Sequence, residues 1–586
     1  MIKKSTVVLA SGLVWLRWFI ASLSGYIHPD EFFQNPEITS SLIFGIQAFT
    51  PWEYQPQNAA RSIVAPFLTT GIPFWILKNI LPEGQLPSAT QLYITERLGA
   101  FVWSLFIDLC VYRLCKQTGA SKPLIPMLLV ATSQITLAYY THTFSNSFES
   151  VLLCLCLSTV VDYTKSSSNK LSFALGALFS LGVFTRITFP LFALPIGIAF
   201  IVHVYKSRNI HHLVSLTLGF FSLTVFCITA DSVYYGTLFL TSNDKPFRDA
   251  HQFISTLFNP MALASFKAEG SIVITPVNNL LYNMNAKNLQ LHGIHPRYTH
   301  LAINLPLLFG PLAIQSLLEI PSVLKKATVD TSKHFLYILI GIVFTSLVGL
   351  SIIPHQEARF LCPLLIPLVL IYTWRRPNLS LSFWLSWFLF NIITTYVFGV
   401  IHQGGIVPAM RFLHYQTKGI HNCYVLTNGG LSCSVDGSTD VDNYYNITTK
   451  LVFYKTYMPP QHLLAAPLVE GNHHIRVLDF SSRYDDLVKE LEQSSGVILR
   501  RRKMGAIDFA KTSTKNAYER TLFITPSFIN LPIIPHHRYM LLATFSPHVG
   551  FDDMDKMISR AQETNSAETQ MNLNVFLMLS DKDDTS

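Results

Sequence analysis

Apolar runs of about 20 residues recur along the first two thirds of this 586-residue sequence, and they constrain the fold more than any other feature. A helix of that length crosses the hydrocarbon core of a bilayer. The sequence is 50% hydrophobic and only 13% charged, whereas soluble domains have about 25% charged residues. We therefore predict a polytopic α-helical membrane protein with about 11 transmembrane helices. These are expected over residues 6–27, 93–115, 123–140, 146–163, 171–187, 190–205, 213–234, 301–319, 335–353, 358–373 and 379–402.

Basic residues in the short connections indicate the orientation, because Lys and Arg are retained on the cytoplasmic side of a membrane. With the N-terminus in the cytoplasm, every other cytoplasmic connection carries a basic pair: Lys116 and Lys122, Lys165 and Lys170, Lys206 and Arg208, Lys325 and Lys326, and Arg375 and Arg376. Loops 28–60 and 235–300 and the region after residue 402 then share the opposite compartment. The stretch 61–80 is apolar but contains two prolines and a glycine. It is expected to be a re-entrant or interfacial element, with an extra span as the alternative.

Arg17 lies in the middle of the first predicted span. An arginine inside a membrane normally faces protein or water rather than lipid chains. Two placements therefore remain open for Arg17, one among the other helices and one beside a lipid phosphate.

The region after residue 402 differs in character, because it contains more than half of the acidic residues. Runs rich in β-branched and aromatic residues predict strands at 450–458, 474–480, 496–502 and 538–545. Two further stretches predict helices, at 483–493 and 552–563. We expect a transmembrane catalytic domain over 1–402, a small α/β domain over 403–575 and a disordered tail over 576–586.

Six of the eight cysteines lie in or beside the predicted spans, where a thiol usually serves as a small apolar side chain. Cys423 and Cys433 lie in the C-terminal region, and we expect a disulfide between them if that region faces an oxidising compartment. Two Asn-x-Ser/Thr sequons occur, at Asn446 in the C-terminal region and at Asn378 in a predicted cytoplasmic loop. The predicted topology allows glycosylation of Asn446 alone.

Four polar motifs fall on the non-cytoplasmic side: "HPDEFFQ" (28–34), "HGIHPRYTH" (292–300), "PHQEARFL" (354–361) and "YKTYMPP" (454–460). These residue types suit glycosyl transfer from a phosphate-linked sugar. In such a reaction a carboxylate takes the proton of the attacking alcohol, and cationic side chains bind the phosphate that leaves. Each motif also has a plainer interpretation. Adjacent carboxylates at a helix exit, for example, are more often solvated or cap a helix.

The sequence gives little support for a metal site. Asp440-Val-Asp442 and Asp553-Met-Asp555 have the spacing used in metal-assisted sugar-nucleotide chemistry, but they lie in polar stretches where such triads arise by chance. The three histidine pairs of the chain have no further cysteine or histidine at ligand spacing. We therefore expect no metal and no cofactor.

The motif "HPDEFFQ" after the first predicted span resembles the signature of the lipid-dependent mannosyltransferases of glycosyltransferase family 22. "HQEARFL" at 355–361 is similar to the second signature of that family, "HGIHPRYTH" to its long luminal loop, and "FYKTYMPP" at 453–460 to a motif near its C-terminus. The resemblance implies a multispanning fold of the GT-C type in the endoplasmic reticulum membrane, with a luminal active site and dolichyl phosphate mannose as donor. The net charge of +8 is explained largely by the cytoplasmic loops, so nucleic acid is not an expected partner.

The sequence Arg297-Tyr298-Thr299-His300 refines this expectation. It is similar to that of the family members that add the fourth, side-branch mannose to a glycosylphosphatidylinositol (GPI) precursor lipid through an α-1,2 linkage. Members that act at the third GPI mannose or on N-glycan precursors tend to have a His-Trp-Tyr type sequence there, and these acceptors remain the first alternative. A transporter or flippase is the second, although the sequence shows no corresponding halves of the kind found in transporters.

The resemblance also implies roles for individual residues in a single inverting displacement. Asp30, or in its place Glu31, accepts the proton of the attacking hydroxyl, and no second carboxylate is required as nucleophile. Arg359 and His355 are expected to bind the donor phosphate. Further contacts to the phosphate or the sugars are expected from His28, Arg186, Arg297, Tyr298, Glu357, Lys455 and Tyr457.

Overall fold

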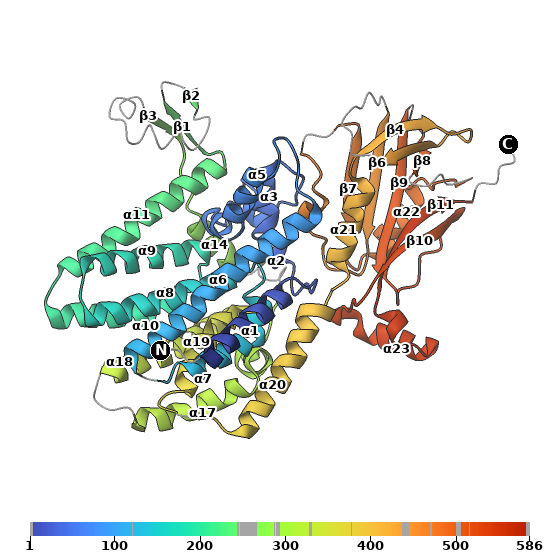
Figure 1. Ribbon diagram of the computed structural model, residues 1–586. Coiled ribbons are helices and arrows are strands. Elements are labelled where there is room, and N and C mark those ends of the chain that lie inside the picture. The colour runs from blue at the N-terminus through green and yellow to red at the C-terminus, as the bar shows by residue number, and fades with distance from the viewer. Residues whose placement is uncertain are drawn as a thin grey trace. The chain divides into compact units, whose positions relative to one another are not determined.

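The computed structural model describes residues 4–119, 121–242, 245–246, 266–285, 287–288, 293–326, 331–376, 378–435, 445–468, 471–499, 506–514 and 516–581. The chain forms two compact units, whose elements are labelled in Figure 1. Unit 1 comprises Met1–Trp18, Thr50–Ile72 and Leu98–Ile392, and unit 2 comprises Phe19–Phe49, Pro73–Arg97 and Ile393–Ser586. The predicted boundary at residue 402 therefore differs from the observed division, because two early segments belong with the C-terminal region.

Unit 1 consists mainly of helices (Figure 1). Those that lie in it wholly or in part are α1 (Lys4–Ala21), η1 (Trp52–Tyr54), α4 (Val64–Pro66), η2 (Phe67–Gly71), α6 (Ala89–Thr118), α7 (Leu124–Thr132), η3 (Ile135–Tyr139), α8 (Ser145–Lys165), α9 (Asn169–Thr185), α10 (Phe189–Ser207), α11 (His211–Tyr234), α14 (Thr275–Met284), η4 (His300–Asn304), α16 (Leu305–Phe309), α17 (Pro311–Lys326), α18 (Thr331–Ile352), η5 (Ala358–Leu364), α19 (Leu365–Tyr372) and α20 (Leu381–Tyr396).

Six helices of the described residues are long and apolar enough to cross a membrane: Ala89–Thr118, Ser145–Lys165, Phe189–Ser207, His211–Tyr234, Lys333–Ile352 and Leu381–Ile401. A seventh span results if His300–Phe309 and Pro311–Lys325, which meet at a bend of 115°, are counted as one. The prediction of a polytopic α-helical membrane protein is confirmed, and six or seven of the about 11 predicted spans are long apolar helices in the described part of the chain.

The difference arises because several predicted spans are shorter or interrupted. The segments 6–27, 171–187 and 358–373 overlap the shorter apolar helices Val8–Ala21, Asn169–Thr185 and Ala358–Tyr372. The segment 123–140 is interrupted where α7 ends, because Ser133 takes an extended ψ of 138°. The stretch 61–80 forms α4, η2 and α5 (Ile72–Ile80), and its re-entrant character stays a prediction.

Helices α9 and α11 lie side by side in unit 1, and glycine makes their approach possible (Figure 1). A Cβ atom on Gly176 of α9 would lie 1.9 Å from the carbonyl oxygen of Leu216, and one on Gly219 of α11 would lie 2.0 Å from that of Phe173. Small residues at such positions let two membrane helices pack backbone to backbone.

Arg17 of α1 packs among helices of unit 1. Its side chain is 1% exposed, and its two terminal nitrogens lie 2.9 and 3.0 Å from the carboxylate oxygens of Asp108 on α6. Nη1 also lies 3.2 Å from the hydroxyl oxygen of Ser104. The ion pair explains how an arginine is accommodated inside an apolar segment.

The loop 235–300 contains a three-stranded antiparallel sheet of β1 (Leu238–Ser242), β2 (Lys245–Pro246) and β3 (Phe266–Gly270), followed by α14. Much of the rest of this loop lies outside the described residues. Its last part, 293–300, is described and bears on the site below.

Unit 2 is built around an eight-stranded sheet. Its strands are β4 (Ile420–Val425), β5 (Leu431–Val435), β6 (Asn446–Phe453), β7 (His473–Asp479), β8 (Ala506–Lys511), β9 (Ala517–Pro526), β10 (His537–Phe545) and β11 (Leu573–Ser580). The order is β10-β11-β9-β8-β5-β4, and β6 pairs in parallel with both β7 and β9, so the sheet is mixed. Helices α21 (Ile406–Thr417), α22 (Tyr484–Gln493) and α23 (Met554–Thr564) accompany it (Figure 1).

Three of the four predicted strands in this region are present as β6, β7 and β10, and both predicted helices are present as α22 and α23. The predicted strand at 496–502 is not formed at 496–499, where Val497 makes only an isolated bridge to Leu579, and its remainder lies outside the described residues. The prediction of disorder from residue 576 is wrong up to residue 580, because the apolar sequence of β11 pairs with β10 on one side and β9 on the other. Residues 582–586 lie outside the described residues.

The core of unit 2 joins the opening loop to the C-terminal region. Tyr26, Phe32 and Phe33 of the loop are buried in one apolar cluster with residues of α21, β6, β9 and β11. Cys423 of β4 and Cys433 of β5 form a disulfide elsewhere in this unit. The loop that carries "HPDEFFQ" is therefore part of a folded core.

Candidate active site

The opening loop of unit 2 turns its two adjacent carboxylates toward different surroundings. Pro29 precedes α2 (Asp30–Phe33) with φ at −50°, a helical value that its ring imposes. The Glu31 side chain is 0% exposed, whereas that of Asp30 is 27% exposed. Successive helical residues point about 100° apart, so the turn that buries Glu31 leaves Asp30 accessible.

Glu31 is held by Arg97 of α6. Its Oε1 accepts a hydrogen bond from Arg97 Nη2 at 3.0 Å, and its Oε2 accepts one from the backbone N–H of Ile27 at 3.1 Å. The guanidinium lies over the rings of Tyr93 and Phe32, 4.9 and 5.6 Å from their centres. Burial raises the pKa of Glu31 to about 7, although Arg97 acts in the opposite direction. Glu31 is thus an internal side chain engaged by a cation.

Asp30 has polar neighbours of a different kind. Its Oδ2 accepts a hydrogen bond from the amide of Gln34, one turn along the chain. The backbone N–H of Asp30 donates to Nδ1 of His28 at 3.2 Å. His28 Nδ1 also lies 3.8 Å from the Asp30 carboxylate. The amide of Gln34 therefore orients the accessible carboxylate of Asp30.

A second group of buried ionisable side chains holds the opening loop at Glu37. His462 of η7 (Gln461–Leu464) lies between Glu37 of α3 (Pro36–Phe44) and Glu96 of α6, with Nδ1 to Oε1 3.1 Å and Nε2 to Oε2 2.9 Å. All three side chains are 0% exposed. Burial alone would lower the pKa of His462, but the two carboxylates raise it to about 9. The imidazole is therefore protonated at neutral pH and lies between the two carboxyl groups.

The motif at 454–460 lies against the opening loop within unit 2. The ring of Tyr457 packs on those of Tyr26 and His402, with centres 5.4 and 5.3 Å apart, and the Tyr26 hydroxyl donates to the carbonyl of Met458 at 3.0 Å. Lys455 Nζ lies 2.9 Å from the carboxylate of Asp553. The predicted phosphate contact from Lys455 thus competes with an ion pair inside the unit.

Within unit 1, the motifs at 292–300 and 354–361 are joined by hydrogen bonds. The N–H of His295 donates to the carbonyl of Pro354 at 2.9 Å, and the N–H of His300 donates to Oε1 of Gln356 at 2.9 Å. His355 Nδ1 lies 3.2 Å from the carbonyl oxygen of Gly293. The two motifs therefore form one local structure.

The motif at 354–361 carries a cluster of charges. Glu357 lies between His355, whose Nε2 is 2.6 Å from its Oε1, and Arg359, whose Nε donates to its Oε2. Burial alone would lower the pKa of His355, but the hydrogen bond with Glu357 raises it. One carboxylate therefore orients both the guanidinium of Arg359 and the imidazole of His355.

Arg186, from the turn after α9, joins this cluster through an aromatic ring. The guanidinium groups of Arg186 and Arg359 lie 5.0 and 5.6 Å from the centre of the Phe360 ring. Glu149 of α8, which is 1% exposed, lies 3.3 Å from Nε of Arg186. Two arginines, both less than 10% exposed, are thus gathered around one aromatic ring in unit 1.

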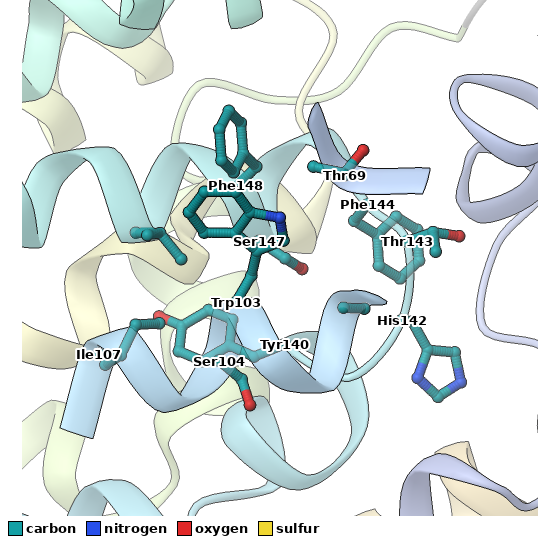
Figure 2. A pocket seen from close by; sticks show the side chains of 12 residues that line it. Thr69, Trp103, Ser104, Ile107, Tyr140, His142, Thr143, Phe144, Ser147 and Phe148 are labelled. Atoms are coloured by element: carbon teal, nitrogen blue, oxygen red, sulfur yellow. The ribbon is translucent and has the colours of Figure 1, made fainter. Parts of the chain in front are cut away.

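A small cavity of unit 1 adjoins this cluster through Phe144 (Figure 2). Aromatic side chains including Trp103, Tyr140, Phe144 and Phe148 line it. The guanidinium of Arg359 lies 5.9 Å from the centre of the Phe144 ring. The cavity volume is about 20 Å³, which holds about one water molecule and is too small for a lipid chain.

Comparison with known proteins identifies the family. The family model described as the Alg9-like mannosyltransferase family, glycosyltransferase family 22, matches residues 8–428. The chain belongs to this family. The expectation drawn from the four motifs is therefore confirmed at the level of the family, and the chain is a mannosyltransferase of the multispan membrane class rather than a transporter.

Two curated relatives of this Alg9-like chain are similar over most of their length. The human protein named GPI alpha-1,2-mannosyltransferase 4 is 32% identical over 510 residues, which cover 80% of this chain and 77% of the relative. GPI mannosyltransferase 4 of Saccharomyces cerevisiae is 35% identical over 412 residues, covering 68% and 70%. Among solved structures, the oligosaccharyltransferase AglB of Archaeoglobus fulgidus matches 68% of this chain and 56% of its own, at 14% identity and a TM-score of 0.37.

The remaining predicted residues have simpler surroundings. Arg297 donates to the carbonyl of Ile352, and Tyr298 is 61% exposed. Among the residues that the structure describes, no three His, Cys, Asp or Glu side chains are grouped so that they hold a metal ion. Asp553, of the second acidic triad, pairs with Lys455 and Lys556, and the first triad at 440–442 lies outside the described residues.

Several residues of the site were missed from the sequence. Arg97, Glu96 and His462 hold the opening loop, and Glu149 and Phe360 hold the arginines of unit 1. One signal was present, because Glu96 and Arg97 are adjacent charges inside a predicted span, where charged residues are rare and usually functional or paired.

Proposed function

We propose that this Alg9-like enzyme transfers mannose from dolichyl phosphate mannose to the third mannose of a GPI precursor, in an α-1,2 linkage, at the luminal face of the endoplasmic reticulum membrane. The acceptor is supported by the two relatives, whose names specify GPI mannosyltransferase 4, and by the sequence Arg297-Tyr298-Thr299-His300. The luminal face is supported by the basic pairs in the predicted cytoplasmic loops. The donor is that of the lipid-dependent family that the motifs resemble.

The proposed general base is Asp30. The observation that carries this assignment is the contrast between two neighbouring carboxylates. Glu31 is 0% exposed and bound to Arg97, whereas Asp30 is 27% exposed and receives a neutral amide hydrogen bond. A general base must reach the proton that it removes, and of these two groups Asp30 meets that requirement.

The reaction is a single displacement. The 2-hydroxyl oxygen of the third mannose attacks the anomeric carbon of the donor while the Asp30 carboxylate takes the hydroxyl proton. The bond between the anomeric carbon and the phosphate oxygen breaks, and its electron pair leaves with dolichyl phosphate. A β-linked donor thereby gives an α-linked product. One carboxylate suffices because a phosphate leaves as a stable anion, whereas retention would require a second carboxylate as nucleophile.

The proposed contacts to the donor phosphate come from unit 1. Arg359 and Arg186 supply planar guanidinium groups, which bind phosphate oxygens in pairs. His355 adds a third cation when protonated, a state that Glu357 favours. Glu357 in turn orients both His355 and Arg359. Further proposed contacts to the acceptor come from His28, Arg297, Tyr298, Lys455 and Tyr457.

The test is transfer of radiolabelled mannose from dolichyl phosphate mannose to a three-mannose GPI precursor in microsomes. Wild type is compared with Asp30→Asn and with Asp555→Asn, which removes an exposed carboxylate from α23 of the same unit. We expect a four-mannose lipid from wild type and from Asp555→Asn, and about a hundredfold less or lower still from Asp30→Asn at equal protein abundance.

Two results would overturn the proposal. If wild type makes no four-mannose lipid but mannosylates a three-mannose GPI analogue at another position or a dolichol-linked N-glycan precursor, the acceptor is wrong. If Asp30→Asn keeps its activity, the base is another group.

A further inference from the structure

A chain of buried charges surrounds the opening loop in unit 2, and the proposed chemistry does not use it. Arg97 binds Glu31, the adjacent Glu96 binds His462, and His462 binds Glu37. All five side chains are 0% exposed. The loop is therefore attached at two points, Glu31 and Glu37, to α6 and to η7.

The attachment at Glu37 ties together several backbone segments. Its Oε2 accepts a hydrogen bond from the N–H of Phe49 at 2.8 Å, and the N–H of His462 points to the same carboxylate at 3.2 Å. The His462 ring lies 6.0 Å from that of Phe32 on α2. His462 therefore acts on both ends of the segment that contains Asp30.

Stability alone does not account for this arrangement. Burying charges costs desolvation energy, and replacement of buried ion pairs by apolar side chains of similar volume is often neutral or stabilising. Apolar residues would hold the loop against the core at less cost. Directed pairs, unlike apolar contacts, fix one register and one orientation.

We propose that His462 is a positioning residue of the transfer reaction, which holds Glu37 and Glu96 together and so fixes the loop that carries Asp30. This inference rests on the proposed function, in which Asp30 is the base. His462 itself touches neither donor nor acceptor in this account, and it acts through α3 and α6. A misplacement of the base by about 1 Å costs about a hundredfold in rate, so a loosened loop is expected to lower kcat.

The test compares His462→Gln with a matched control, Lys450→Met. Lys450 of β6 is likewise a buried cation between two carboxylates of unit 2, with Nζ 2.9 Å from Glu490 and 3.2 Å from Glu519. Its loss disturbs a comparable charge group in the sheet, not in the opening loop. Both variants are purified as full chains in micelles. Kinetics and hydrogen exchange are then measured on the same samples.

We expect His462→Gln to lower kcat about tenfold to a hundredfold, with the donor KM within about twofold of wild type. Backbone exchange over residues 27–37 is expected to accelerate about tenfold. Lys450→Met is expected to keep the kcat and the loop exchange of wild type. If His462→Gln fails to fold, Glu37→Gln provides the comparison, since it keeps the side-chain volume and is expected to lower kcat about threefold to tenfold with the same faster exchange.

The inference is overturned if faster exchange in His462→Gln is confined to residues 461–464, or if kcat stays within about twofold of wild type. It is also overturned if Lys450→Met changes kcat and loop exchange equally. Failure of the proposed function is a separate result, because it appears as absence of the four-mannose product from wild type. The exchange comparison does not depend on that product.

Discussion

Neutralising Glu31 should damage the fold, whereas neutralising Asp30 should damage the reaction. Glu31 and Arg97 are both 0% exposed and their charged atoms lie 3.0 Å apart. In Glu31→Gln the guanidinium stays charged and buried but loses its anion, and removing one partner of a buried pair costs about 3–5 kcal/mol. The rings of Tyr93 and Phe32 beside Arg97 offset part of this cost. A loss of about 3 kcal/mol in the free energy of unfolding is therefore expected.

A double-mutant cycle measures this coupling. Glu31→Gln, Arg97→Met and the double variant are unfolded by SDS in mixed micelles, with tryptophan fluorescence as the signal. Glu31→Gln leaves the guanidinium buried without its opposite charge, Arg97→Met leaves Glu31 buried without its cation, and the double change removes both groups. We expect the double variant to lose less stability than the sum of the single variants, by at least about 2 kcal/mol.

Asp30→Asn should behave in the opposite way. Because Asp30 is partly exposed, its change should alter the free energy of unfolding by no more than about 0.5 kcal/mol. Transfer should fall by about 10²–10⁴, the usual contribution of a general base. The reasoning is refuted if the Glu31 and Arg97 changes are additive. It is also refuted if Glu31→Gln is as stable as wild type but inactive while Asp30→Asn transfers mannose, since the roles would then be exchanged.

Four further predictions follow from single features of the two units. Burial alone would lower the pKa of His462, but its carboxylate partners raise it from 6.5 to about 9, so its contribution to stability is complete below pH 6.5 and is lost as the pH rises through 9. Between these two pH values, His462 should make the free energy of unfolding fall by about 1.4 kcal/mol per pH unit. Unfolding measured as a function of pH should show this decrease in wild type, and His462→Gln should lack the part that comes from His462. Arg359→Lys should raise the donor KM about tenfold in a donor titration, because an ammonium cannot bind two phosphate oxygens as a guanidinium does. Reduction of the Cys423–Cys433 disulfide, which closes a separation of 10 residues, should lower the stability of unit 2 by about 2–3 kcal/mol in denaturant titrations. Asn446, exposed at the start of β6, should carry a glycan, so Asn446→Gln should abolish the endoglycosidase-sensitive mobility shift on gels.

The membrane class of this chain could be predicted from its sequence because a span is a local pattern of composition. The number of spans could not be predicted in the same way, because a break such as the one at the extended Ser133 depends on a single backbone angle. Strands β6, β7 and β10 have dense apolar and β-branched runs, and the same is true of β11, although its residues 576–580 fall in the predicted tail because charged residues follow them closely. The partners of β11 come from earlier in the chain and are not visible in a local window.

The residues of the candidate site also divide into those that the sequence predicts and those that it does not. The motif residues were found because short signatures are local, but the sequence does not show which of the adjacent Asp30 and Glu31 is accessible, since that depends on how α2 packs. Their partners were missed because they are remote: Arg97 is 66 residues from Glu31, and His462 is 425 residues from Glu37. Charge pairing at such separations follows from tertiary packing alone.

The four motifs fall into two pairs, one in each unit, and the pairs differ in chemistry. Residues 28–34 and 454–460 of unit 2 supply the accessible carboxylate and its aromatic support. Residues 293–300 and 354–361 of unit 1 supply the guanidinium of Arg359 and the imidazole of His355. A base acts on the attacking hydroxyl only as the bond forms, whereas cations that hold the donor phosphate act on the bound ground state as well as on the transition state. Variants of Asp30 in the unit 2 pair should therefore lower kcat at constant donor KM, and variants of Arg359 or His355 in the unit 1 pair should raise donor KM. Equal effects on both constants from variants of Asp30 and of Arg359 would mean that this division of roles is wrong.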